Sequence, residues 1–112
     1  MEAFANCKNL EWIIFDGDDI SLKTIGAGAF DNCLNFQGFK FYSTDGSLWD
    51  FEGLESIGDG AFSDCSNLNL SINGNTLTYI GKEAFLNTGI TSLTQNTTTR
   101  TLTIGDAAFK NS

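Results

Sequence analysis

The nine residues IGDGAFSDC, at positions 57–65, decide the fold because the chain repeats them. The related stretches are EAFANC at 2–7, IGAGAFDNC at 25–33, IGKEAFLNT at 80–88 and IGDAAFKNS at 104–112. Their shared form is I-G-x-x-A-F-x-[ND]-[C/T/S]. Self-similarity at such a period is typical of repeat proteins, in which each unit buries its apolar face on its neighbours. We therefore expect a stack of similar coils.

A second apolar pattern lies between these units. After each unit, the order apolar-x-x-apolar-x-apolar ends in the alternation of a short strand, as in Leu10-Ile13-Phe15 and Phe36-Phe39-Phe41. The copies at 68–72 and 90–93 depart from this spacing. The Phe residues of the units recur every 23 to 32 residues, and two insertions, around 16–19 and 42–51, explain the longer intervals. We predict one short strand per coil.

The repeated positions have a structural explanation. The Ile and Phe residues are expected to form an aliphatic and an aromatic stack, and the small Ala leaves room for a tight helical turn. Gly after Ile suits a bend or a close backbone approach, and the Asn or Asp two residues after Phe can bond to turn amides. The last position holds Cys7, Cys33, Cys65, Thr88 and Ser112. Because thiol and hydroxyl interchange there, we expect a small, half-buried residue rather than a catalytic group, a disulfide or a metal ligand.

Composition excludes several function classes. The 112 residues include no His, and six Lys and Arg stand against fourteen Asp and Glu, a net charge of −8. Such a charge repels nucleic acid, and no apolar run is long enough to insert into a membrane. The Asp-rich stretch at 16–19 lacks the EF-hand spacing, and Gly58-Asp59-Gly60 lacks the Lys of a phosphate loop. The sequence predicts no enzyme, no catalytic residue, no metal site and no cofactor.

The repeated unit resembles the BspA-type leucine-rich repeats of bacterial and protist surface proteins. The resemblance covers essentially the whole chain, although the family often has Pro just after the strand and this chain has none. It implies an α+β repeat solenoid with short parallel strands on one face and short helical turns and loops on the other. We expect residues 1–112 to form one segment of about four repeats, incomplete at both ends.

The partner-binding residues are sought among those that do not repeat, because solenoids commonly bind with the strand face or with inserted loops. If Ile13 and Phe15 point inward, Trp12 and Ile14 point outward, as does Lys40 in the second strand. The insertion carries Tyr42, Trp49 and Phe51, which either contact a partner or cap the local core. The candidate binding residues are Trp12, Ile14, Lys40, Tyr42, Trp49 and Phe51.

The resemblance implies a non-catalytic module that binds a protein or glycan, in an adhesin-like protein at the cell surface or secreted. A structural spacer and an intracellular protein-interaction scaffold are the alternatives. Neither end of the chain carries the polar cap that terminal repeats need. We therefore expect either a piece of a longer array or a short array closed by an unusual end or by end-to-end self-association.

Overall fold

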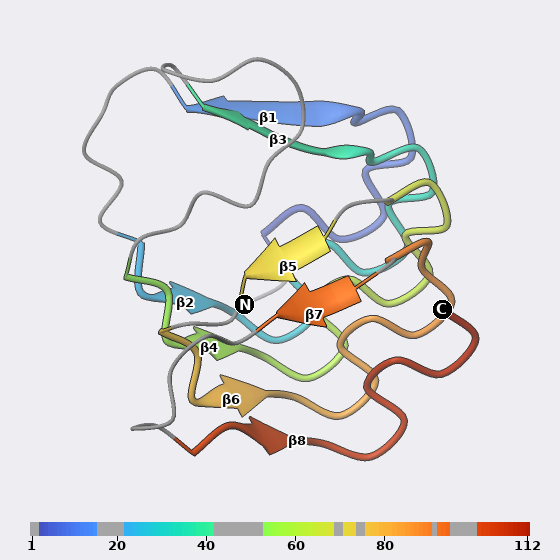
Figure 1. Cartoon of the computed structure of the whole chain (residues 1–112). Helices are drawn as coiled ribbons and strands as arrows, with labels where there is room; N and C mark the ends of the chain where they lie inside the picture. The colour runs from blue at the N-terminus through green and yellow to red at the C-terminus, as the bar shows by residue number, and fades with distance from the viewer. Residues whose placement is uncertain are drawn as a thin grey trace.

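The computed structural model describes residues 3–15, 22–41, 53–68, 71–73, 76–90, 92–94 and 101–112. All the regular secondary structure in these residues consists of short strands. The strands are β1 (Trp12–Phe15), β2 (Thr24–Ile25), β3 (Gly38–Phe41), β4 (Ser56–Ile57), β5 (Ser71–Asn73), β6 (Tyr79–Ile80), β7 (Ser92–Thr94) and β8 (Thr103–Ile104). The coils lie one on another, as predicted from the repeat (Figure 1).

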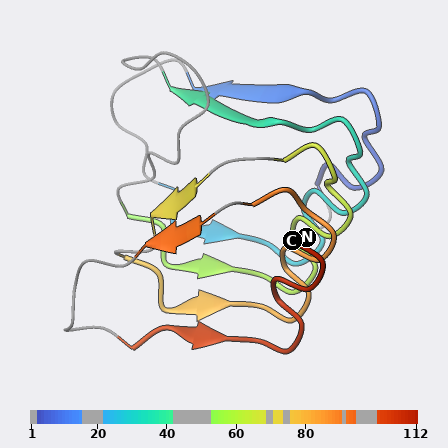
Figure 2. The same cartoon turned by 45° about the vertical axis from the view of Figure 1, so that its right-hand side comes forward.

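Four of the strands form a continuous parallel sheet in the order β2-β4-β6-β8. The register places Ile25 opposite Ile57, Ile57 opposite Ile80 and Ile80 opposite Ile104. Each of these strands contributes the isoleucine of one repeated unit, so the predicted aliphatic stack is confirmed. Figure 2 shows the four strands side by side, with the turns that follow them stacked on one flank of the molecule. We call these strands the continuous sheet.

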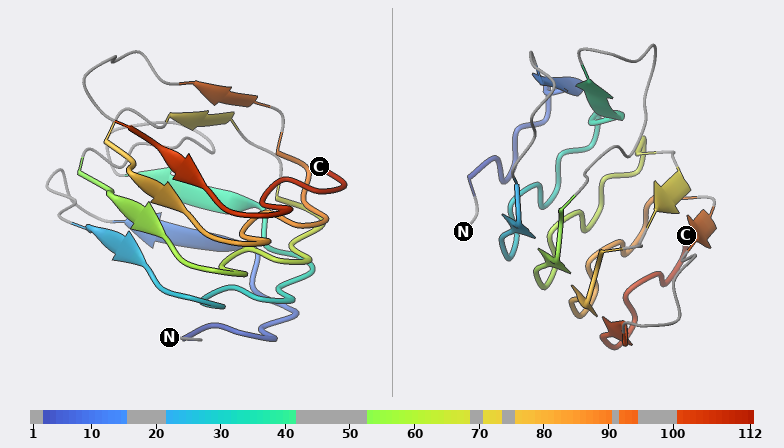
Figure 3. Two further views of the ribbon diagram at one scale, coloured as in Figure 1. Left: turned by 90° about the horizontal axis from the view of Figure 1, so that it is seen from below. Right: turned by 60° about the vertical axis from the view of Figure 1, so that its left-hand side comes forward.

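The other strands, which lie where one strand per coil was predicted, are divided into two pairs. That prediction was wrong in number, because the Ile of the repeated units forms a second set of strands. β1 pairs in parallel with β3, and β5 with β7, but β3 and β5 belong to different sheets. From the Cys or Thr of the motif to the middle of each strand, at Ile13, Phe39, Ile72 and Leu93, the chain takes 6, 6, 7 and 5 residues. The number of residues between the motif and these strands therefore varies from coil to coil. Figure 3 shows the two pairs, with β1 beside β3 and β5 beside β7.

The segments after the continuous sheet are turns, and the short helical turns expected there are absent from the described residues. In the second coil the N–H of Ala29 donates to the carbonyl of Gly26, but the next amide, of Phe30, donates to Ala61 of the following coil. Positive φ recurs in the turns, at Gly28 (64°) and Asn32 (62°) for example. A positive φ at the third residue is the mark of a type II turn, so the backbone cannot continue as a helix.

Phenylalanine side chains form the centre of the core. Phe4, Phe30, Phe62, Phe85 and Phe109 stack in that order with ring centroids 5.1 to 5.2 Å apart. Phe36 stacks on Phe30 at 4.8 Å, and Phe39 meets Phe62 edge-on at 6.2 Å. Phe62 and Phe85 have no exposed surface, whereas Phe4 at the first coil is 39% exposed. The predicted aromatic stack is therefore confirmed.

Glycine after the repeated isoleucine lets neighbouring coils touch. A Cβ added at Gly58 would lie 2.4 Å from the backbone nitrogen of Ala27, and one at Gly81 would lie 2.4 Å from that of Asp59. Real Cβ atoms do not approach backbone this closely, so a side chain would force the coils apart. The close approach that the sequence indicated is confirmed at both positions.

Candidate interaction surfaces

The cysteines of the motif belong to the scaffold. All three are free, and Cys33 and Cys65 are fully buried, whereas Cys7 is exposed. The thiol of Cys33 donates to the carbonyl of Phe4 at 2.9 Å, and that of Cys65 to the carbonyl of Phe30 at 3.0 Å. Ser112 makes the equivalent bond to Phe85 at 2.6 Å. At these three residues the position ties a coil to the one before it, which explains why Cys and Ser interchange. Thr88 differs, because its hydroxyl donates to the carbonyl of Phe85 in its own coil at 3.1 Å.

Burial also makes these thiols poor nucleophiles. It raises the pKa of Cys65 to about 12 and that of Cys33 above its usual range, since an apolar surrounding disfavours the thiolate. A cysteine attacks as the thiolate, so neither side chain is suited to covalent catalysis near neutral pH. Among the described residues, no group of His, Cys, Asp and Glu could hold a metal ion.

The Asn or Asp of the motif forms a second row of contacts between coils. Asn32 donates to Asn6 at 3.0 Å, Asn87 to Asp64 at 2.6 Å and Asn111 to Asn87 at 3.0 Å, all through side chains. All five residues of the row have φ between 58° and 63°. The sequence predicted bonds to turn amides, and the structure shows side-chain bonds to the neighbouring coil instead. Asn and Asp are the side chains that best tolerate this left-handed backbone.

The β1–β3 pair presents apolar side chains to solvent. Ile14 is 69% exposed, as predicted, while Trp12 is half-buried and keeps part of its surface accessible. In the register Trp12 lies opposite Gly38, and Ile14 lies opposite Lys40. Gly38 has no side chain, so an indole at Trp12 has room beside β3. The backbone thus groups Trp12, Ile14 and Lys40 on one face, although the Lys40 side chain lies outside the described part.

The predicted aromatic loop cannot be placed. Tyr42, Trp49 and Phe51 lie outside the described residues. Their assignment as partner-binding residues, or as a cover for the core, stays a prediction.

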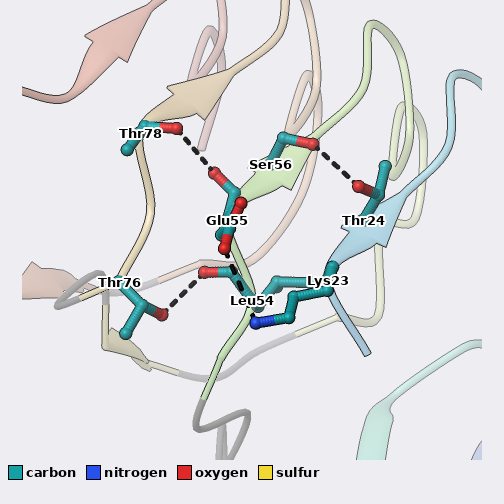
Figure 4. Close-up of polar contacts among 7 residues, drawn as sticks. All are labelled: Lys23, Thr24, Leu54, Glu55, Ser56, Thr76 and Thr78. Atoms are coloured by element: carbon teal, nitrogen blue, oxygen red, sulfur yellow. Dashed lines mark hydrogen bonds and ion pairs between the residues drawn. The ribbon is translucent and has the colours of Figure 1, made fainter. Parts of the chain in front are cut away.

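A row of hydroxyl side chains crosses the continuous sheet, and sequence reasoning missed it. Thr24 lies opposite Ser56, Ser56 opposite Tyr79 and Tyr79 opposite Thr103. The Ser56 hydroxyl donates to that of Thr24 at 3.3 Å (Figure 4). The signal was present, because each of these residues stands just before the isoleucine of an Ile-Gly pair. We call Thr24, Ser56, Tyr79 and Thr103 the hydroxyl row.

Polar contacts beside the hydroxyl row bind its strands together. Lys23 and Glu55 form an ion pair at 3.6 Å, with both side chains more than half exposed, so solvent screens it strongly. The hydroxyl of Thr78 donates to the carbonyl of Glu55 at 3.2 Å, and that of Thr76 to the carbonyl of Leu54 at 2.6 Å (Figure 4). These bonds satisfy the strand ends and do not form a cavity or a catalytic group.

Tyr79 and Asp59 form a charge-assisted pair at the surface. The Tyr79 hydroxyl donates to a carboxylate oxygen of Asp59 at 2.8 Å, and the backbone N–H of Lys82 donates to the same oxygen at 2.9 Å. The bond from Tyr79, followed by that from Lys82, lowers the pKa of Asp59. The same hydrogen bond raises the pKa of Tyr79. Asp59 therefore has a structural role, although Gly58-Asp59-Gly60 resembles part of a phosphate loop.

Comparison with known proteins agrees with this geometry. The family model for the BspA type leucine rich repeat region matches residues 1–112, in six copies. No curated protein and no solved structure gave a match. Within the described part, no helix has the length and apolar character needed to cross a membrane. The repeated sequence, the parallel strands and this match together show that the chain belongs to the BspA-type leucine-rich repeat family.

Proposed function

We propose that this chain is a non-catalytic module that binds a protein or glycan on its β1–β3 face, in an adhesin-like protein at the cell surface or secreted. The observation that carries the proposal is Ile14, a large aliphatic side chain that is 69% exposed in the middle of a paired strand. Membership of the family supports a protein-interaction repeat module. The surface location rests on the family alone.

The β1–β3 face has properties that suit recognition. Trp12 and Ile14 are held by a strand paired over four residues, so their positions are fixed before a ligand arrives. A fixed apolar group loses little conformational entropy on binding, and tryptophan is enriched among the residues that dominate binding energy. The net charge of −8 favours neutral or basic ligands over acidic ones.

Binding screens with matched variants test this assignment. Protein and glycan arrays are probed with the wild type, with Ile14→Ser and with Leu34→Ser, which changes an aliphatic residue of similar size that is 39% exposed in the turn before β3. We expect a ligand whose affinity falls at least tenfold in Ile14→Ser and is unchanged in Leu34→Ser. Equal affinities for all three proteins would contradict the proposal and would favour the spacer.

End-to-end self-association is a second part of the proposal. Phe4 in the first coil is 39% exposed, and Ile104 on the last strand of the continuous sheet is 48% exposed. Stacking of one copy on the exposed ring of Phe4 in the next would bury apolar surface, which favours association. Light scattering should show a mass that rises with concentration, and Phe4→Ser should reduce the rise. A constant monomer mass at high concentration would contradict self-association.

A further inference from the structure

A hydrogen-bonded pair of polar side chains lies at the start of the β1–β3 pair. The side-chain N–H of Gln37 donates to a carboxylate oxygen of Glu11 at 3.3 Å, and the backbone N–H of Gln37 donates to the carbonyl of Glu11 at 2.7 Å. Each residue immediately precedes its strand, and Glu11 is exposed. The two bonds hold a carboxylate and a carboxamide side by side. We call Glu11 and Gln37 the polar pair.

The polar pair keeps the capacity to bond a ligand. Within the described residues, the second carboxylate oxygen of Glu11 and the side-chain carbonyl of Gln37 have no hydrogen-bond partner. Asn35 differs, since its amide nitrogen donates to the carbonyl of Lys8 at 2.8 Å and its oxygen accepts from Asn67 at 3.4 Å. A carboxylate accepts, and a carboxamide both donates and accepts. The polar pair can therefore bond groups that do both.

Apolar side chains follow the polar pair directly along the strand. Trp12 comes next after Glu11 and is half-buried, and Ile14, two residues further on, is 69% exposed. Side chains two residues apart on a strand lie on one face, so the indole and the isoleucine form a short apolar strip. Gly38, the register partner of Trp12, places no side chain beside the indole on β3. The face thus combines an apolar strip with a polar pair at its start.

A sugar ring carries the matching combination of groups. Each of its hydroxyl groups donates and accepts, whereas its C–H groups form an apolar face. The face of an indole bears partial negative charge, which attracts C–H groups that carry partial positive charge. A peptide has no such ring, in which polar edge and apolar face occur together. A ring stacked on Trp12 would bring its hydroxyl groups toward Glu11 and Gln37.

Charge narrows the choice of sugar. Glu11 presents an exposed carboxylate on this face, and the whole chain has a net charge of −8. Sulfated, phosphorylated and sialylated sugars carry negative charge and are repelled by such a surface. The face therefore suits uncharged sugars.

We propose that the ligand of the β1–β3 face is an uncharged oligosaccharide, with one ring stacked on Trp12 and hydroxyl groups of that ring bonded to Glu11 and Gln37. The Glu11 carboxylate accepts from one hydroxyl, and the side-chain carbonyl of Gln37 accepts from another. Ile14 packs against the apolar face of a neighbouring ring. This ligand class rests on the proposed function, which includes both proteins and glycans, and narrows it to one of them.

Oligosaccharide arrays test the ligand class. The full chain is applied to uncharged oligosaccharides of glucose, galactose, mannose and N-acetylglucosamine, and to their sulfated forms. We expect binding to at least one uncharged oligosaccharide and at least tenfold weaker binding to its sulfated form. Binding to none of the uncharged compounds, or equal binding of the sulfated forms, would overturn the proposal. A protein ligand that depends on Ile14 would then leave the proposed function intact, whereas no Ile14-dependent ligand of either class would contradict both.

Matched carboxylate variants test the polar pair. Glu11→Ala and Glu55→Ala each remove one exposed carboxylate just before a strand and change the net charge equally, but Glu55 precedes β4 of the continuous sheet. We expect at least tenfold weaker binding of the oligosaccharide to Glu11→Ala and unchanged binding to Glu55→Ala. Equal affinities in the two variants would show that Glu11 does not contact the sugar and would overturn the proposal.

Two substitutions at Trp12 test the stacked ring. Trp12→Phe keeps an aromatic face, whereas Trp12→Leu keeps only the apolar character. We expect binding within about threefold of the wild type in Trp12→Phe and at least tenfold weaker binding in Trp12→Leu. Equal losses in the two variants would overturn stacking. If either variant fails to fold, Glu11→Ala decides the proposal, because that residue is exposed.

Discussion

The continuous sheet and the opposite strand layer are built from the same repeats, yet one joins all four of its strands and the other is divided. The continuous sheet pairs β2, β4, β6 and β8 without a break, whereas β3 and β5 lie in separate sheets. In the four units that carry the Ile, the Phe follows it by five positions, but the step from the Cys position to the strand varies from five to seven residues. The layer whose spacing is constant is continuous, and the layer whose spacing varies is divided.

The largest loss of stability is expected at Phe62, in the core between the two strand layers. Phe62 is fully buried and stacks between Phe30 and Phe85 at 5.1 Å on each side. Phe62→Ala should reduce the free energy of unfolding by about 3 to 5 kcal/mol, because it leaves a cavity in the centre of the core. Urea unfolding followed by circular dichroism measures this. Phe4→Ala is the control, since that ring is 39% exposed, and an equal loss in both variants would contradict the stack.

A second variant disturbs the continuous sheet alone. Gly81→Ala would bring a Cβ to 2.4 Å from the Asp59 backbone, so we expect a loss of about 2 to 3 kcal/mol from overpacking. Gly60→Ala is the matched control, because its Cβ would meet nothing within 4 Å and only φ, at +65°, opposes it. That control should cost about 1 kcal/mol. Equal losses of stability in thermal unfolding for the two variants would show that close contact between coils is not the reason for glycine at position 81.

A third variant should stabilise a turn. Ala107 has φ of 58° at the position where other coils have Gly28 and Gly60. Ala107→Gly removes the left-handed strain but adds freedom to the unfolded chain, so we expect a net gain of about 0.5 kcal/mol. Differential scanning calorimetry can resolve this shift. A lower melting temperature than in the wild type would show that the turn does not hold Ala107 in that conformation.

The smallest effect concerns acid stability. The hydrogen bond from Tyr79 lowers the pKa of Asp59 from its ordinary value of 3.8. The bond therefore stabilises the fold above pH 3.8, and this stabilisation is lost as the pH falls through the pKa that Asp59 has in the folded protein. Tyr79→Phe should therefore lose less stability than the wild type between pH 6 and pH 3. The amide of Lys82 still donates to Asp59, so part of the dependence should remain. If the wild type and Tyr79→Phe have the same profile of melting temperature against pH, the Tyr79–Asp59 hydrogen bond does not contribute to acid stability.

The repeated positions were predictable because each has one role in every coil. The Phe stack, the Ile register and the close approach at glycine all follow from that recurrence. The division between β3 and β5 was not predictable, since strand pairing depends on register as well as on apolar pattern. The helical turns were expected from the family, but amides such as that of Phe30 bond to the next coil instead of their own turn.

The candidate surfaces were predictable only in part. Ile14 was predicted to be exposed because it is an apolar residue at an outward position of β1, and its exposure is confirmed. The hydroxyl row was missed because its members differ in size, from Ser56 to Tyr79, and share only a hydroxyl.

Native-state amide hydrogen exchange tests the central claim most directly. If the coils stack in one parallel sheet, the amides of Gly58 and Gly81 should exchange near the global unfolding limit, because each is bonded to the coil before it. Rapid exchange at Gly58 and Gly81 would contradict the stacked architecture.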